Sequence, residues 1–176
     1  MGILKEKKIT EIVSDLITIS AMTSPKSKGD AIETLVLEES EKEMLAEESF
    51  QLSDEYNDEA YSDEGEKINE SDEILLLGIE EHDSLGIDCK ACGYENCENF
   101  DKAEKKEGLF KGPSCSFKLI DLGMSIGHAL NTAENHNVDY EISIKSGMAA
   151  RSLGLMSSQL CIGILLKVNP DKNYFP

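Results

Sequence analysis

The sequence predicts an α+β fold in which a mixed β-sheet is flanked by helices and a four-cysteine module is inserted. Three observations lead to this class. Apolar residues recur with helical spacing over residues 3–22 and 117–135, and apolar runs of strand length occur at 74–79 and 160–168. A cysteine-rich segment separates the two halves. Helices and strands are thus mixed along a chain of 176 residues, which is typical of layered helices and sheet in about one domain.

Residues 1–49 are expected to begin the α+β body. The apolar residues of segment 3–22 fall at i, i+3, i+4 and i+7, which predicts an amphipathic helix. Those residues are Ile9, Ile12, Val13 and Leu16. The helix is expected to end before Pro25, because the residue that precedes a proline avoids the helical conformation.

A strand, a short helix and an acidic segment are predicted next. Residues 32–37 are expected to form the strand, and Ser40 followed by Glu43 is the pattern of a capping box for a helix over residues 41–49. Residues 50–72 are acidic, poor in apolar side chains and without periodicity. Such a segment buries too little apolar surface to offset the entropy of ordering, so we predict a flexible loop there.

The C-terminal half is expected to complete the body. Residues 73–88 contain the buried strand 74–79 and the approach to the cysteine module. Residues 117–176 contain two helices, the second over residues 147–156, and the apolar strand 160–168.

The helix over residues 117–135 carries a candidate core face. Its members are Leu119, Leu122, Ile126, Ala129, Leu130 and Ala133. Gly123 and Gly127 lie four residues apart on the same helix, which indicates either close packing of another backbone or room for a ligand.

The charge of the chain bears on its partners. The net charge is −18, and residues 38–73 contribute most of it, with 16 Asp and Glu against two Lys. Binding to phosphate groups needs Lys and Arg, so nucleic acid and anionic membrane surfaces are not expected as partners. No apolar run approaches the roughly 20 residues of a membrane span, and the start has no signal-peptide core. These features predict a cytoplasmic protein.

Four of the five cysteines are grouped. Cys89, Cys92 and Cys97 have two and then four residues between them, and 17 more residues precede Cys115. Grouped cysteines in a reducing compartment are more typical of metal binding than of disulfides. Four thiolates suit zinc or an iron–sulfur cluster, and only the first pair has zinc-ribbon spacing, which favours the cluster. Unliganded thiols are the third alternative, and Cys161 is expected to be a small buried residue outside the site.

The module over residues 89–116 has features that suit a negatively charged centre. Gly93 can adopt a positive φ, which would turn backbone N–H groups toward sulfur. Cys97 is expected to begin a short helix over ENFDKAEKKE and to aim its free N–H groups at the centre. Tyr94 is expected to shield the centre from water. The loop that leads back to the fourth cysteine is marked by Gly108, Gly112 and Pro113.

The segments CKACGYENCENF and GPSC resemble the four-cysteine [4Fe–4S] domain of the acetyl-CoA decarbonylase/synthase corrinoid-protein large subunit. The wider chain resembles the DUF2148 family, uncharacterised prokaryotic proteins that contain a ferredoxin domain. This resemblance extends through TSPKSKGD, LLLGI, SCSFKLIDLGMSIGHALNTAENHNVD and GMAARSLGL. It implies that Cys89, Cys92, Cys97 and Cys115 bind the iron of a [4Fe–4S] cluster, and it implies no particular reaction.

The chain departs from the family pattern in three places. Tyr140 and Glu141 replace a usual Asn-Arg pair, and Phe175-Pro176 replaces a closing Phe-Asp-Arg. The acidic stretch 50–72 also diverges. The two lost basic positions count against an anionic ligand bound there.

The order of elements also resembles the nitroreductase-like flavin fold. That resemblance implies FMN as a second cofactor, with its phosphate held by basic residues. The candidate bases are Lys26, Lys28, Arg151 and Lys172, and the Arg-rich N-terminal motif of that fold is absent.

The leading hypothesis is a single-cluster electron-transfer protein that works with a redox partner protein and that can form a homo-oligomer. The first alternative is a flavin- or cluster-dependent reductase with a pocket beside the helix face from Gly123 to His128, where Asp121 and His128 would both lie. The second alternative is a zinc-stabilised binding module. His82 and His136 are expected to be structural or surface residues.

Overall fold

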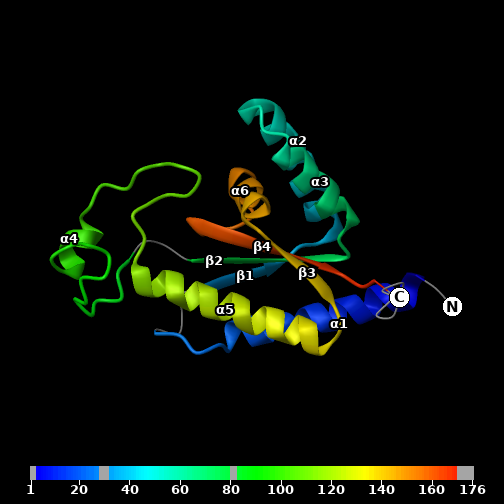
Figure 1. The fold of residues 1–176 in the computed structure, drawn as a ribbon, viewed down its shortest axis with the longest axis horizontal. Helices are drawn as coiled ribbons and strands as arrows, with labels where there is room; N and C mark the ends of the chain where they lie inside the picture. The colour runs from blue at the N-terminus through cyan, green and yellow to red at the C-terminus, as the bar shows by residue number, and fades with distance from the viewer. Residues whose placement is uncertain (1–2, 28–31, 80–82, 170–176) are drawn as a thin grey trace, which may run out of the picture.

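The protein is an α+β structure with one sheet between two helical layers (Figure 1). The computed structural model describes residues 3–27, 32–79 and 83–169. The elements, in chain order, are α1 (Ile3–Met22), β1 (Ile32–Val36), α2 (Glu39–Tyr56), α3 (Ala60–Glu70), β2 (Glu73–Ile79), α4 (Cys97–Asp101), α5 (Ser116–Asn135), β3 (Asp139–Ser143), α6 (Ile144–Ser152) and β4 (Leu160–Lys167).

The sheet has four strands in the order β1-β2-β4-β3. Each neighbouring pair is antiparallel, and the register places Leu76 opposite Leu35 on one side and opposite Gly163 on the other. The predicted α+β class is therefore confirmed, while the predicted mixed sheet is wrong. Strand direction depends on the path by which the intervening helices and module return to the sheet, and hydrophobic patterning does not report that path.

The two faces of the sheet carry separate cores. Alternate residues of β2 point to opposite faces, as the period of a strand requires. Leu75 and Leu77 meet α1 and α5, whereas Ile74 and Leu76 meet α2, α3 and α6. Every residue of β2 is buried, which explains its continuous apolar run.

The acidic segment 50–72 is helical, so the prediction of a flexible loop is wrong. Helix α2 continues to Tyr56 and α3 follows from Ala60, and the two pack against each other above the sheet (Figure 1). The apolar residues of this segment are few but fall on one side, where Tyr61 and Ile68 are 3% and 0% exposed. The acidic side chains lie mostly on the other side, in water, as in an amphipathic helix.

The start of α2 also differs from the prediction. The N-cap is Glu38, which forms a capping box with Glu41, so the helix begins before the predicted Ser40–Glu43 box. The box is of the predicted kind and lies two residues earlier in the chain.

Helix α1 has the predicted extent but buries a different face. Ile9, Ile12 and Leu16 are 56%, 52% and 40% exposed, and Val13 alone of the predicted set is buried. The buried side also contains Ile17 and small or polar residues, namely Thr10, Ser14 and Ala21. Small residues on this side let α1 and α5 approach closely, so the larger side chains face outward.

Most of the residues that were predicted to form the core face of helix α5 are buried. Leu122, Ile126, Ala129 and Ala133 are buried, while Leu119 is 39% exposed. A Cβ atom added to Gly123 or Gly127 would meet no atom of the described residues within 4 Å, so neither glycine packs against another backbone in that part of the chain. Helix α6, in contrast, lies directly on β4, because a Cβ at Gly147 would come within 1.9 Å of the Cys161 carbonyl oxygen.

None of the helices in the described part of the chain combines the length and the apolar character needed to cross a membrane.

Candidate functional site

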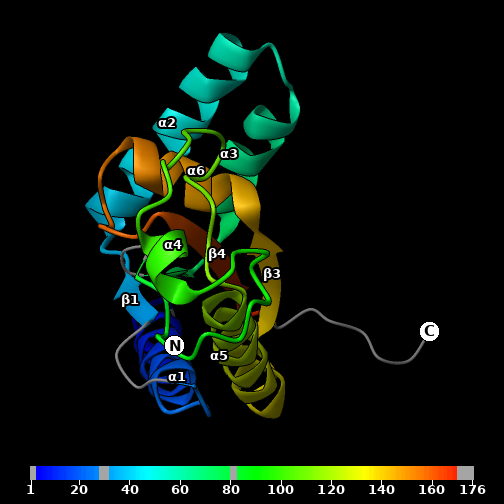
Figure 2. The ribbon, with the colours of Figure 1, turned by 90° about the vertical axis from the view of Figure 1, so that its left-hand side faces the viewer.

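The four cysteines predicted as ligands lie in a segment that projects from one end of the sheet, between β2 and α5 (Figure 1, Figure 2). Cys89 is exposed, Cys92 and Cys97 are half-buried, and Cys115 is buried with 8% exposure. All four are free thiols. Their exposure therefore decreases from Cys89, at the surface, to Cys115, in the protein body.

The backbone around Cys89 and Cys92 is tightly coiled. Asp88 and Lys90, with φ values of 48° and 61°, adopt the left-handed conformation that is uncommon outside glycine. Gly93 has a φ of 86°, as predicted, and its N–H donates to the Lys90 carbonyl at 2.9 Å. Such alternation of conformations turns successive peptide groups toward a common centre, which is the arrangement that binds anions.

Asp88 and Cys97 hold each other through two hydrogen bonds. The Asp88 backbone N–H donates to the Cys97 sulfur at 3.3 Å, and the Cys97 N–H donates to the Asp88 carboxylate at 2.7 Å. The N–H group that meets a sulfur is therefore that of Asp88, whereas the N–H of Gly93, from which such a contact was predicted, is bonded to the Lys90 carbonyl. Cys97 is also the first residue of α4, as predicted, but this helix ends at Asp101 and is shorter than expected.

Cys115 is fixed by the start of α5. It is the N-cap residue of that helix, and its carbonyl accepts a hydrogen bond from the Leu119 N–H at 3.1 Å. The chain reaches it through a return loop, which we define as residues 104–114. Two backbone hydrogen bonds between Lys106 and Gly112, of 2.7 and 3.0 Å, close this loop, and Phe110 packs against the core beneath α6.

An aromatic pair forms the interior of the module. Phe100 is completely buried, and the Tyr94 ring meets its ring edge-on with centroids 5.5 Å apart. Tyr94 therefore has the packing role that was predicted. Together the two rings limit the access of water to one side of the cysteine turn, which we define as residues 88–97.

Lys105 is a residue of the module that the sequence did not indicate. Its ammonium lies 4.2 Å from the centre of the Phe100 ring, is shielded from solvent, and has no hydrogen-bond partner among the described residues. Burial lowers the pKa of Lys105, while negative charge at Asp101, Asp83 and Cys92 acts to raise it. The cation thus lies close enough to Cys92 to interact with a thiolate there.

The described side chains do not form a finished metal site. Within residues 3–27, 32–79 and 83–169, no three His, Cys, Asp or Glu side chains are grouped closely enough to hold a metal ion. The ligand set therefore stays a prediction. The donors present do fit a negatively charged four-thiolate centre, because the module combines four free thiols, an N–H donor to Cys97 and a shielded cation beside Cys92.

Of the bases predicted for a flavin phosphate, the two that the structure describes, Lys26 and Arg151, are not brought together. Lys26 donates from its Nζ atom to the carbonyls of Ala21, Met22 and Ser24 at 3.3, 2.5 and 3.0 Å, so it caps the end of α1. Arg151 lies in α6 on the opposite face of the sheet (Figure 1). Two further candidates, Lys28 and Lys172, lie outside the described residues, as does His82.

Asp121 and His128 differ in burial, and the pocket that they were predicted to line stays a prediction. Asp121 is 1% exposed and accepts hydrogen bonds from the Ser27 N–H and hydroxyl at 2.9 and 3.0 Å. His128 is exposed, and its carbonyl accepts from the Ser20 hydroxyl, which links α5 to α1.

Cys161 is buried beneath α6, as predicted. Its thiol donates to the Met156 sulfur at 3.4 Å, and burial raises the pKa of Cys161 to about 12. A thiol of this kind stays protonated and unreactive.

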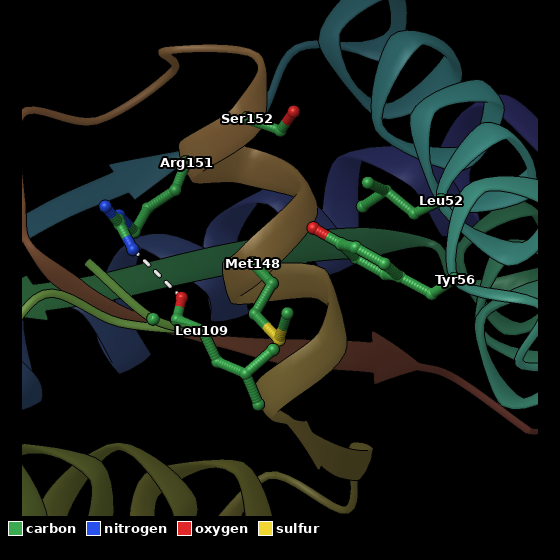
Figure 3. A pocket seen from close by; sticks show the side chains of 7 residues that line it. Leu52, Tyr56, Leu109, Met148, Arg151 and Ser152 are labelled. Atoms are coloured by element: carbon green, nitrogen blue, oxygen red, sulfur yellow. Dashed lines mark hydrogen bonds between the residues drawn. The ribbon is translucent and has the colours of Figure 1, made fainter.

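A pocket of about 320 Å³ lies between α2, α6 and the return loop (Figure 3). Its wall is formed by Leu52, Tyr56, Gly108, Leu109, Met148, Arg151 and Ser152. Arg151, the only arginine of the chain, donates from Nη1 to the Leu109 carbonyl at 2.9 Å (Figure 3). Its other Nη atom lies 3.7 Å from the Glu107 carboxylate. The arginine therefore ties the return loop to the body.

The antiparallel sheet and its helices define a protein of the nitroreductase-like fold. Nitroreductase A from Vibrio parahaemolyticus aligns with a TM-score of 0.55 and 15% identity, over 93% of this chain and 60% of that chain. A BluB-like flavoprotein from Clostridium difficile 630 aligns with a TM-score of 0.54 and 10% identity, over 100% and 94%. At such identities the likeness shows the fold alone, and it confirms the predicted fold. This chain spans 60% of the length of the Vibrio parahaemolyticus enzyme.

The chain belongs to the DUF2148 family, described as uncharacterized proteins containing a ferredoxin domain. The family pattern matches residues 111–176, which include Cys115. An uncharacterized protein from Archaeoglobus fulgidus is 34% identical over 166 residues, which make up 94% of this chain and 90% of that protein. The predicted family is thus confirmed, and its ferredoxin domain agrees with an iron–sulfur, metal-binding protein.

Proposed function

We propose that this protein is an iron–sulfur redox protein in which Cys89, Cys92, Cys97 and Cys115 hold a [4Fe–4S] cluster. The observation that carries the proposal is that four free thiols lie within the one segment that links β2 to the start of α5. The ferredoxin domain named for the family supports it. When bound, such a cluster supplies one-electron transfer.

The residues of the module have separate roles in this proposal. The four thiolates hold the iron, and the Asp88 N–H donates to the Cys97 sulfur, which stabilises negative charge on it. The Lys105 cation supports the thiolate of Cys92. Phe100 and Tyr94 exclude water on one side, whereas Cys89 stays exposed. The exposed side is the surface that a cytoplasmic redox partner protein would contact.

Metal and sulfide analysis of protein purified without oxygen tests the proposal. We expect about four iron and four sulfide per chain, because a [4Fe–4S] cluster is held by four thiolates. Replacing Cys89, Cys92, Cys97 or Cys115 by serine should remove most of the bound iron and its visible absorption. Cys161→Ala is the matched control and should retain both, since the Cys161 thiol is buried under α6.

Two results would contradict the proposal. Stoichiometric zinc without sulfide, even after reconstitution with iron and sulfide, would indicate the zinc-stabilised binding module instead. Equal iron loss in the Cys161→Ala control and in the four serine variants would show that the losses report misfolding and not ligation.

A flavin-dependent reductase is the second candidate, and the fold favours it. Structures of this fold include an NADPH:FMN oxidoreductase from Vibrio harveyi complexed with NAD⁺, at a TM-score of 0.54 and 16% identity. Lys26 is engaged by backbone carbonyls and Arg151 by the return loop, which weighs against a phosphate held by these two residues together. FMN released from denatured protein at about one per chain would support this candidate, and its absence after growth with excess riboflavin would remove it.

A further inference from the structure

The pocket between α2, α6 and the return loop has the chemistry of a binding site. We propose that it binds a small organic carboxylate, whose negative charge is taken by Arg151 and whose apolar part lies against Leu52 and Met148. This proposal concerns a site that contains none of the four cysteines, so it stands whether or not they hold a cluster.

The wall of the pocket is polar and apolar in similar parts, and its apolar side chains are well supported. Leu52 and Met148 are 5% and 8% exposed and belong to the core above the sheet. The Met148 sulfur accepts a hydrogen bond from the Tyr61 hydroxyl at 3.2 Å, and the Tyr61 and Tyr56 rings lie 5.7 Å apart. These contacts fix the side chains that a ligand would meet, and a preformed apolar wall with a few polar groups is typical of a ligand site.

The wall of the pocket carries a positive charge, whereas the net charge of the chain is negative. Arg151 is the only charged side chain among the residues that form the wall, in a protein of net charge −18. Its Nη1 donates to Leu109, and the described residues accept no other hydrogen bond from the guanidinium, which leaves its remaining N–H groups for a planar acceptor. A carboxylate can accept two parallel hydrogen bonds from the planar guanidinium of an arginine.

Glu107 is the carboxylate next to this guanidinium, and it also pairs with Lys111 at 3.4 Å. The Glu107 side chain is 70% exposed and lies 3.7 Å from Arg151, too far for a hydrogen bond. Exposed pairs of this kind contribute little, so a ligand carboxylate that also buries apolar atoms should displace Glu107. The volume of about 320 Å³ is at the small end of ligand sites, which limits the occupant to a small molecule.

Methyl NMR of the full chain, purified with its metal centre, tests the site with benzoate as the probe. With ¹³C-methyl methionine labelling, Met148 reports the pocket, while Met22 and Met124 report the outer surface of α1 and α5. We expect benzoate to shift the Met148 resonance in a saturable manner and to leave the other two unchanged. Benzamide, the uncharged analogue, should bind at least roughly tenfold more weakly, because it loses the charge-assisted hydrogen bonds.

Two variants test whether Arg151 and Glu107 determine the affinity for benzoate. Arg151→Gln should weaken benzoate binding by roughly tenfold or more and abolish the preference over benzamide. Glu107→Gln, a change at an exposed side chain that leaves folding intact, should tighten benzoate binding several-fold because it removes the competing carboxylate.

The proposal is wrong if Met148 shows no saturable shift up to roughly 10 mM benzoate, a weak affinity for a ligand of this size. It is equally wrong if benzoate and benzamide bind alike, or if Glu107→Gln weakens binding. A shift at Met22 or Met124 of the same size as that at Met148 would indicate non-specific adsorption and would also overturn it.

Discussion

Lys105 brings a positive charge into the cysteine module. Its Nζ atom is shielded from solvent, lies over the Phe100 ring, and interacts with negative charge at Cys92 and Asp101. Burying a cation without a hydrogen bond is unfavourable, so its position is best explained by a nearby negative charge. The thiolates of the proposed cluster would supply that charge.

We therefore expect Lys105→Met to lower the reduction potential of the bound cluster. Reduction adds negative charge, and removal of a nearby cation makes that addition less favourable, by an amount on the order of tens of mV. Redox titration followed by electron paramagnetic resonance measures the shift.

Lys102→Met is the matched control for Lys105. The Lys102 side chain is 71% exposed and pairs with Glu98, so solvent and the partner carboxylate screen its charge. A shift of equal size in both variants, or an upward shift with Lys105→Met, would show that the shielded cation does not act on the cluster.

The local structure of the cysteine turn could be predicted from the sequence because it depends on residues that are close together in the chain. The spacing of the cysteines, the positive φ of Gly93 and the start of α4 at Cys97 all depend on neighbouring residues. The sequence did not indicate Lys105, and it indicated Arg151 only as a base for a flavin phosphate, since the contact of Arg151 with Leu109 spans 42 positions. Such contacts depend on the folded path of the chain.

At the scale of elements, the α2–α3 pair shows where composition misleads. The acidic side chains of residues 50–72 suggested disorder, yet Leu52, Tyr61 and Ile68 are enough to attach both helices to the core. Short apolar faces gain stability from what they pack against, and a sequence window does not contain that partner. Strands β1, β2 and β4 were predicted, the last two because they are continuous apolar runs, whereas β3 was missed because its residues are polar and mostly outside the core.

We expect Ile68→Ala to destabilise the protein by about 2–5 kcal/mol, the usual cost of truncating a fully buried isoleucine. Chemical denaturation followed by circular dichroism measures the free energy of unfolding. Glu66→Ala, at an exposed position of the same helix, should change it by less than about 0.5 kcal/mol. If both variants matched the wild type, this segment would contribute no packing to the fold.

At the scale of the whole molecule, the outer surface of the α1–α5 layer is apolar. Ile9, Ile12 and Ile19 of α1 are 52–56% exposed, and Ile120 and Met124 of α5 are 53% and 38% exposed. The two helices lie side by side beneath the sheet and are linked by the Ser20–His128 hydrogen bond (Figure 1). We define this surface as the α1–α5 outer face. Apolar patches of several hundred Å² on a folded protein usually mark an interface.

The α5 part of the α1–α5 outer face favours a second copy of the chain as its partner, whereas α1 exposes the acidic residues Glu11 and Asp15. From Ser116 to Ala133, the charged residues of α5 are Lys118 and Asp121, and both are buried. Two copies of a chain with net charge −18 repel each other, but contact through this part of α5 would bring no like charges together. Gly123 and Gly127 face open space there and would let two α5 helices cross closely about a two-fold axis.

We accordingly expect the protein to be a homodimer at roughly 100 μM, far above the Kd of a specific complex, with Ile120→Glu converting it to a monomer. The substitution places two carboxylates opposite each other at the symmetric contact, and since Ile120 is 53% exposed it should leave the fold unchanged. Sedimentation equilibrium distinguishes the two states. Ile144→Glu, a change at a 56% exposed isoleucine at the start of α6, should leave the dimer intact. A wild-type protein that sediments as a monomer at this concentration would show that the α1–α5 outer face is not a contact between copies.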